Sequence, residues 1–255
     1  MKKKSYLALF LSVLMALSIL TSCGSKEPEV GTIAPIVEEP APVPTEAPAE
    51  DPTEAPTEAS TEAPAAEKAV SLGRMEGGVY TNSYTGYGCT LDSNWVFYTA
   101  EELQELPADA AELFADTELG DTAAQYSQIA DMKADNNTNL SSIYVLYTQL
   151  PLQERLAYAA LNHEQIIDAT LAQKDLLISS FELSGMQVVS MEKVFVNFLG
   201  EERAAIKTVA TIEGYDYYML QIQDFGLGSY GVTLTISSLM NDVTEDVAAI
   251  FYPVD

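Results

Sequence analysis

Residues that commonly carry catalysis or bind metal ions are scarce in this sequence. The 255 residues include two cysteines, one histidine and one tryptophan. The single histidine, His163, cannot form a usual zinc cluster without cysteines or well-spaced carboxylates, and no G-x-S-x-G turn supplies it with a nucleophilic serine. We therefore expect a protein that is not an enzyme, has no metal site and uses no cofactor. His163 is interpreted as a residue at a helix interface.

Basic residues are also few. The chain has 12 Lys and Arg against 38 Asp and Glu, which gives a formal net charge of −26. Binding to nucleic acid depends largely on Lys and Arg that neutralise phosphates, and an anionic bilayer repels an acidic surface. We therefore expect no nucleic-acid partner. A cationic or divalent partner remains open, beside the simpler interpretation of a solvated acidic surface.

The sequence has one long apolar run, at its amino terminus. It extends from about Tyr6 to Leu20 and follows three lysines, Lys2 to Lys4. A transmembrane helix needs roughly 20 apolar residues. A shorter run after a basic stretch is typical of a cleavable signal peptide, which we expect to occupy residues 1–22.

The end of this run, Leu20-Thr21-Ser22-Cys23, resembles the lipobox of bacterial lipoproteins. In that family a diacylglyceryl group is attached to the cysteine, and the signal peptidase cuts just before it. The resemblance implies lipidation of Cys23, a membrane partner through this anchor, and a place on the extracytoplasmic face of the cell membrane. Two acyl chains hold a protein stably at a membrane, whereas one is marginal. The alternatives are an ordinary secretory signal with an incidental cysteine, and an uncleaved anchor.

Proline is concentrated in one segment. Nine of the twelve prolines lie within residues 24–72, where Thr45-Glu46-Ala47-Pro48 recurs in three further copies or near-copies. A segment so poor in large apolar residues cannot bury enough surface to offset its chain entropy. We expect residues 23–72 to form an extended tether after the lipidated cysteine. A ligand for a receptor of proline-rich motifs is the alternative.

Residues 73–255 are long enough for one globular domain. Period-two alternation and turn signals predict an antiparallel sheet, and apolar residues at steps of three, four or seven predict helices. The fold class is α+β, an antiparallel sheet flanked by helices. The expected elements are hairpins over 79–91 and 128–148, helices over 99–107, 109–117, 153–181 and 243–251, and strands over 188–199, 204–212, 215–224 and 230–237.

This order of elements resembles the α/β/α sandwich of PsbP/Mog1-type domains. The aromatic-rich opening carries the same likeness, in Tyr80-Thr81-Asn82, Gly88-Cys89-Thr90-Leu91-Asp92 and Trp95. Lipoproteins of Gram-positive bacteria that carry such a domain on a proline-rich stalk are similar. Members of the wider fold assist photosystem assembly or bind a small GTPase, so the resemblance implies an accessory role and no catalytic motif.

Three further patterns are interpreted as structural. Gly226–Gly231 matches G-x-G-x-x-G, but the segment after it predicts a strand, not the helix that would bind a pyrophosphate. The turn over 135–139 copies the first EF-hand ligands, yet Leu140 and Leu146 occupy the glycine and glutamate positions of that motif. Cys89 has no partner once Cys23 is lipidated, and we expect it to be a small buried hydrophobic residue.

One cluster suggests recognition. Aromatic residues with polar tips are favoured at binding surfaces, although they also suit strands and cores. The candidate binding residues are Tyr80, Tyr84, Tyr87, Trp95 and Tyr98. We expect a non-catalytic binding or assembly-accessory domain with an envelope protein as partner, and the alternative is a receptor for a small ligand or a cation.

Overall fold

The structure, a computed structural model, describes residues 70–113 and 127–254, and of residues 107–113 it describes the backbone alone. The predicted signal peptide, Cys23 and the predicted tether up to residue 69 lie outside the described residues. Within the described ranges no helix is both long enough and apolar enough to cross a membrane.

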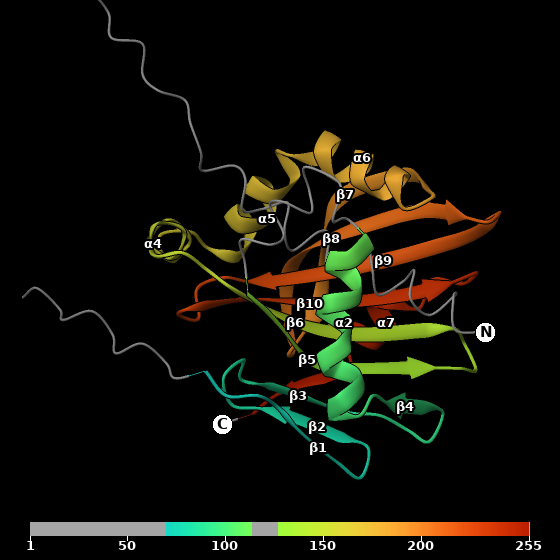
Figure 1. Cartoon of the computed structure of the whole chain (residues 1–255), viewed down its shortest axis with the longest axis horizontal. Coiled ribbons are helices and arrows are strands. Elements are labelled where there is room, and N and C mark those ends of the chain that lie inside the picture. Colours follow the sequence, from blue (N-terminus) through green and yellow to red (C-terminus); the bar gives the residue numbers. More distant parts are fainter. Residues whose placement is uncertain (1–69, 114–126, 255) are drawn as a thin grey trace, which may run out of the picture. The chain divides into compact units, whose positions relative to one another are not determined.

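Seven strands form an antiparallel sheet in the order β4-β5-β6-β10-β9-β8-β7 (Figure 1). Their bounds are β4 Trp95–Phe97, β5 Gln128–Asn136, β6 Ser141–Gln149, β7 Met186–Phe198, β8 Glu201–Ile212, β9 Tyr215–Asp224 and β10 Tyr230–Leu239. The turns Leu199-Gly200 and Glu213-Gly214 have positive φ at both residues, as a two-residue type I′ hairpin requires. The predicted second hairpin and the four-stranded meander are confirmed.

A second, four-stranded sheet has the order β1-β2-β3-β11. Its strands are β1 Arg74–Glu76, β2 Val79–Asn82, β3 Tyr87–Thr90 and β11 Phe251–Pro253. The predicted first hairpin is confirmed as β2 and β3. The predicted terminal helix is shorter than expected, because α7 covers Thr244–Ala248 and β11 then pairs with β3, which places Phe251 opposite Cys89.

The prediction of a single helix over 153–181 is wrong. It is divided into α4 Leu152–Ala159, α5 His163–Leu171 and α6 Lys174–Leu183. Asn162 starts α5 with a capping box, in which its side chain accepts from the Gln165 backbone and Gln165 bonds back to the Asn162 backbone. An asparagine that caps a new helix cannot also continue the preceding one.

The helix α2, Ala100–Leu113, passes through Pro107. The expectation that Pro107 ends the helix was therefore wrong, since a proline removes one backbone hydrogen bond but does not forbid a helix. The backbone of residues 109–113 is helical, as predicted, and residues 114–117 of the second predicted stretch lie outside the described ranges.

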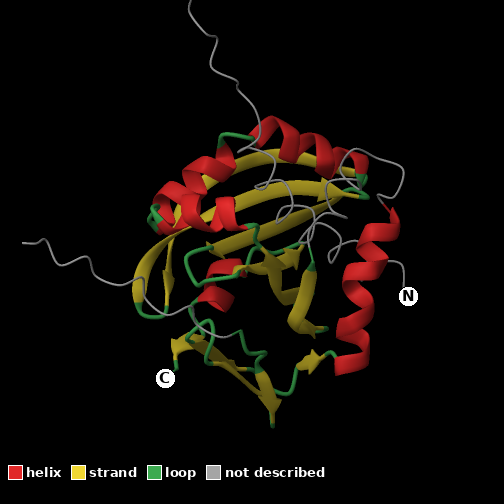
Figure 2. Ribbon diagram, turned by 60° about the vertical axis from the view of Figure 1, so that its left-hand side comes forward, coloured by secondary structure: helices red, strands yellow, loops and turns green. Residues whose placement is uncertain are grey.

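The large sheet lies between two different layers (Figure 2). Helices α2, α5 and α6 pack on one face, through apolar clusters that include Leu103, Ile167 and Phe181. The four-stranded sheet and α7 pack on the other face, in a cluster that includes Tyr80 and Ala248. The α+β class is confirmed, and the second sheet is an element that the sequence analysis did not distinguish.

The layer between the two sheets forms the largest apolar cluster. It joins Leu220, Ile222 and Leu234 of the large sheet to Tyr87 and Cys89 of the small one. Cys89 is fully buried, as predicted, and burial raises the pKa of its thiol to about 12. A thiol with so high a pKa is not a nucleophile at neutral pH.

Gly231 of β10 provides a test of a separate apolar cluster, in which Phe225 packs with Leu150, Tyr158 and Ile166. A Cβ at Gly231 would overlap the ring of Phe225, whereas a Cβ at Gly226, in the loop before β10, would meet nothing within 4 Å. We expect Gly231→Ala to lower the free energy of unfolding by about 1–3 kcal/mol and Gly226→Ala to leave it within about 0.5 kcal/mol. Urea unfolding of both variants measures this, and equal values for the two would contradict the packing described.

Candidate functional site

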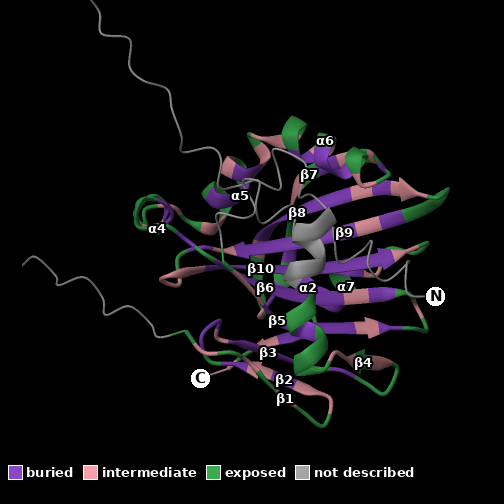
Figure 3. Ribbon diagram, in the orientation of Figure 1, coloured by how far each residue is buried: buried purple, intermediate pink, exposed green. Residues whose placement is uncertain are grey.

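The five predicted aromatic residues do not form one exposed surface. Tyr80, Tyr84 and Tyr87 are buried in the core between the sheets, and Trp95 and Tyr98 at β4 are partly buried (Figure 3). Trp95 packs against the same core as the three buried tyrosines, whereas Tyr98 packs against the α2 cluster on the other face. Their role in binding stays a prediction, and their packing role is observed.

Tyr80 belongs to a buried polar network around Asp131. The Tyr80 hydroxyl donates to Asp131 Oδ2 at 2.5 Å, and Asn82 Nδ2 donates to the same oxygen at 2.7 Å and to the Tyr147 hydroxyl at 2.6 Å. The backbone N–H of Gly73 donates to Asp131 Oδ1 at 2.7 Å. The network therefore joins the large sheet to β2 and to the segment that enters β1.

A register shift places Asp131 in this network. The pairing of β5 with β6 skips from Ala130 to Met132, so Asp131 occupies a β-bulge, a feature that re-aims a side chain. Burial raises the pKa of Asp131, while bonds from Tyr80, Gly73 and Asn82 oppose that rise. Each oxygen of the carboxylate accepts at least one of these bonds, and the network acts as a structural link between the large sheet and β2.

A second polar group lies on the helix-covered face of β5 and β6. Lys133, only 2 % exposed, donates to Asp135 Oδ1 at 2.5 Å and to Ser142 Oγ at 3.1 Å. Burial lowers the pKa of Lys133, and although burial alone would raise the pKa of Asp135, the neighbouring ammonium lowers it. Tyr98 donates to Asp135 at 2.9 Å. The positive charge of Lys133 and the negative charge of Asp135 therefore cancel within this group.

The middle of the same face carries the candidate site. Direct pairing places Gln221 beside Thr235, and Thr235 beside Tyr144. Two residues further along β9, on the same face of the sheet, Gln223 pairs with Thr233 of β10. Thr208 on β8 and Ser237 on β10 lie on the same face. We call this set the central polar face. Its members, all at most 5 % exposed, are Tyr144, Thr208, Gln221, Gln223, Thr233, Thr235 and Ser237.

Several polar atoms of the central polar face have no hydrogen-bond partner among the residues that the structure describes. They are Gln221 Oε1, Gln223 Nε2, Thr208 Oγ1 and the Tyr144 hydroxyl. The other atom of each amide is bonded, since Gln221 Nε2 donates to Thr235 Oγ1 at 3.2 Å and Gln223 Oε1 accepts from Thr170 Oγ1 of α5 at 2.8 Å. These bonds orient both amides, and in each amide one of the two polar atoms stays unbonded among the described residues.

The face offers hydrogen bonds and no reactive group. Its side chains are amides and hydroxyls, and burial raises the pKa of Tyr144, which keeps that hydroxyl protonated. Across the described residues no group of three or more His, Cys, Asp and Glu is placed to hold a metal ion. The arrangement can bind a molecule through amide and hydroxyl contacts, and it supplies no nucleophile with a positioned base.

These residues were not recognised from the sequence, for a physical reason. The alternation in β9 and β10 predicted strands, and no role was assigned to their Gln and Thr positions. In the structure α2 and α5 cover the face on which those positions lie. The signal that could have indicated the site is a set of five polar residues at alternate positions of two neighbouring strands, Gln221, Gln223, Thr233, Thr235 and Ser237.

The structure also places His163 and the glycine-rich motif that the sequence singled out. His163 begins α5, and its Nε2 lies 2.7 Å from Arg203 Nη2 on β8. Because a guanidinium only donates, Nε2 is the acceptor, and His163 is at a helix–sheet interface as predicted. Residues 226–229 connect β9 to β10, which confirms the loop interpretation of the glycine-rich motif.

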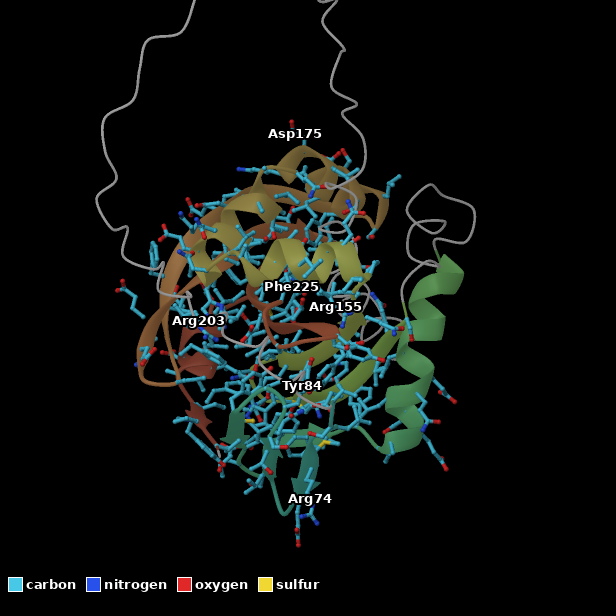
Figure 4. All side chains as sticks on the ribbon, turned by 90° about the vertical axis from the view of Figure 1, so that its left-hand side faces the viewer. Arg74, Tyr84, Arg155, Asp175, Arg203 and Phe225 are labelled. Carbon is cyan, nitrogen blue, oxygen red and sulfur yellow. The ribbon has the colours of Figure 1, made fainter. Side chains whose placement is uncertain are left out.

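Arg155 of α4 and Phe225, the residue after β9, take part in contacts near this loop (Figure 4). Arg155 Nη1 donates to Ser229 Oγ at 3.0 Å, and the rings of Phe225 and Tyr158 are 5.0 Å apart. These contacts attach α4 to the end of β9. The predicted turn over 135–139 joins β5 to β6, where Asn136 Oδ1 accepts from the backbone of Thr138 at 2.9 Å.

No protein-family model matches the chain, and no curated protein matches it either.

Two buried tyrosines, one in the Asp131 network and one in the central polar face, test whether these two groups differ in hydrogen bonding. Tyr80 and Tyr144 are 0 % and 2 % exposed, but of these two hydroxyls only that of Tyr80 has a partner within residues 70–106 and 127–254. We expect Tyr80→Phe to lower the free energy of unfolding by about 1–3 kcal/mol, because it leaves a buried carboxylate short of a donor. Tyr144→Phe removes no bond and should leave the value unchanged or raise it.

Chemical denaturation of the two variants measures both effects. A clear loss of stability in Tyr144→Phe would show that its hydroxyl has a bonding partner within the protein.

Proposed function

We propose that this chain is a lipid-anchored lipoprotein on the extracytoplasmic face of a bacterial cell membrane. The support is the sequence order of basic residues, apolar run, Cys23 and proline-rich segment. The globular part is proposed to be a non-catalytic binding or assembly-accessory domain of PsbP/Mog1 type. The layered α+β arrangement agrees with that type in class, and its four-stranded second sheet is an addition to the α/β/α scheme.

The observation that carries the binding role is the set of buried, unpartnered polar atoms on the central polar face. Buried polar groups in native proteins are almost always bonded to protein, to water or to a ligand. Two groups elsewhere in the fold, around Asp131 and Lys133, follow that rule through protein partners alone. The central polar face differs from both. Its seven members are neutral amides and hydroxyls with no carboxylate among them, which favours a receptor for a small ligand over a cation receptor.

Two cysteines provide a matched test of the anchor. With the full chain expressed in a bacterium and fed labelled palmitate, we expect Cys23→Ser to lose the label and to leave the membrane fraction. Cys89→Ser should keep the label, because Cys89 is buried in the core. Label retained by Cys23→Ser would refute the anchor.

The same cells test the binding role. In-cell cross-linking of the tagged full chain, with mass spectrometry of the captured proteins, is expected to recover one abundant membrane or cell-wall protein if the domain is an accessory factor. The accessory role would be contradicted if the anchored chain and Cys23→Ser captured the same proteins and these were only background proteins.

A further inference from the structure

We infer that the outer edge of β7 binds a second copy of this chain, by antiparallel pairing of β7 with the β7 of that copy. The juxtaposition that carries the inference is a long strand at the end of the large sheet and a half-exposed apolar side chain on it, Phe195. The pairing joins the two large sheets into one continuous sheet. This interaction surface goes beyond the proposed function and does not depend on it.

The edge of β7 is long and open. β7 has 13 residues and is the last strand of the large sheet, where it pairs with β8 (Figure 1). Across residues 70–113 and 127–254, no backbone group outside β8 bonds to the backbone of β7. The other edge strands, β1, β4 and β11, have three residues each. A long edge strand without proline is a template for pairing with another chain.

The turn after β7 determines which backbone groups face outward. Leu199 and Gly200 form a two-residue turn, so the N–H of Glu201 bonds to the C=O of Phe198 and these two residues are a hydrogen-bonded pair. Hydrogen-bonded and non-hydrogen-bonded pairs alternate along an antiparallel ladder. The even-numbered residues from 190 to 198 therefore bond to β8. The odd-numbered residues from 191 to 197 direct their N–H and C=O groups to the outer edge.

The strand pairs with itself in a compatible register. A bulge between Val188 and Ser190 interrupts the ladder with β8, and residues 190–198 are regular. Two copies related by a two-fold axis place residues of the same parity opposite each other, because opposite residues share a face of the sheet. The outward groups of one copy thus meet those of the other. A pairing centred on Val194 uses the whole regular segment, with residue 190 opposite residue 198.

The charges on β7 favour this register. Centred on Val194, the pairing places Lys193 of each copy opposite Phe195 of the other, and an ammonium near an aromatic ring is attracted to it. Within one chain, the Lys193 ammonium already lies 6.0 Å from the centre of the Phe195 ring. A centre at Lys193 or at Glu192 would place like charges directly opposite each other, which is destabilising. A centre at Phe195 shortens the paired segment to residues 192–198.

The charge of the surrounding chain also favours this edge. The whole chain has a formal net charge of −26, so two copies repel each other over most of their surface. Residues 174–212, from α6 to β8, hold five acidic and four basic residues and are nearly neutral. A second copy therefore meets little repulsion when it approaches through β7.

The helix that packs on β7 leaves the centre of this pairing accessible. Leu177 and Phe181 of α6 pack with Met186 and Met191, in the first half of β7. Phe195, on the second half, is 50 % exposed. In an antiparallel pair the first halves of the two strands lie at opposite ends of the shared ladder. The two α6 helices are thereby kept apart.

A charge substitution tests the pairing. The full-length chain carrying Cys23→Ser retains every residue of the globular part, and sedimentation velocity over a range of concentrations should show a species of twice the mass of the chain. We expect Phe195→Lys to weaken this association by on the order of tenfold, because it places lysines opposite Lys193 at two symmetric positions. Gln187→Lys adds the same charge at an exposed residue before the bulge and should associate as the unsubstituted chain does.

Cysteine cross-linking tests the register. In Val194→Cys the two new thiols are directly opposite in a non-hydrogen-bonded pair, with Cα atoms about 4.5 Å apart, within the range of a disulfide. In Glu192→Cys they are offset by four residues, about 14 Å, which is beyond that range. With diamide as the oxidant, Val194→Cys should form a covalent dimer and Glu192→Cys should stay monomeric on a non-reducing gel. Cys89 is buried and does not interfere.

Each contrary outcome overturns the inference. A single mass of one chain at every concentration would show that β7 does not bind a second copy. Equal cross-linking of the two cysteine variants, or equal association of Phe195→Lys and Gln187→Lys, would show that copies associate through another surface or register. If Phe195→Lys does not fold, as its thermal midpoint will show, the cysteine pair still decides.

Discussion

The pairing of β10 with its two neighbours is the constraint on which the rest of the structure depends. Its register with β6 and β9 places Val232, Leu234 and Ile236 on one face of the sheet and Thr233 and Thr235 on the other. A slip of one residue would exchange the two sets. The dry core against the small sheet and the central polar face under the helices are therefore two results of one register.

The two faces use polar residues in different ways. Between the sheets, Asp131 enters a core of apolar side chains and is bonded by Tyr80, Asn82 and Gly73. Under the helices, Gln221 and Gln223 are bonded on one side only. The first arrangement stabilises the attachment of the small sheet, and the second leaves hydrogen-bonding capacity that the fold does not use.

Much of the fold could be predicted from local sequence. Alternation over β7 to β10 and the turns at Gly200 and Gly214 predicted the meander correctly. The errors arose where tertiary contacts decide: β11 forms because β3 offers a strand edge, and α2 continues through Pro107. The central polar face was missed because strand alternation alone cannot show that helices cover the polar side, and the Asp131 network depends on a bulge with no local signal.

The central claim is that Gln221 and Gln223 present buried bonding positions that no described residue of the chain fills. A high-resolution crystal structure of the unliganded chain tests it most directly. The account predicts density for water or a small molecule within hydrogen-bond distance of Gln221 Oε1 and Gln223 Nε2. Side chains turned to bond other protein groups, with no density beside them, would contradict it.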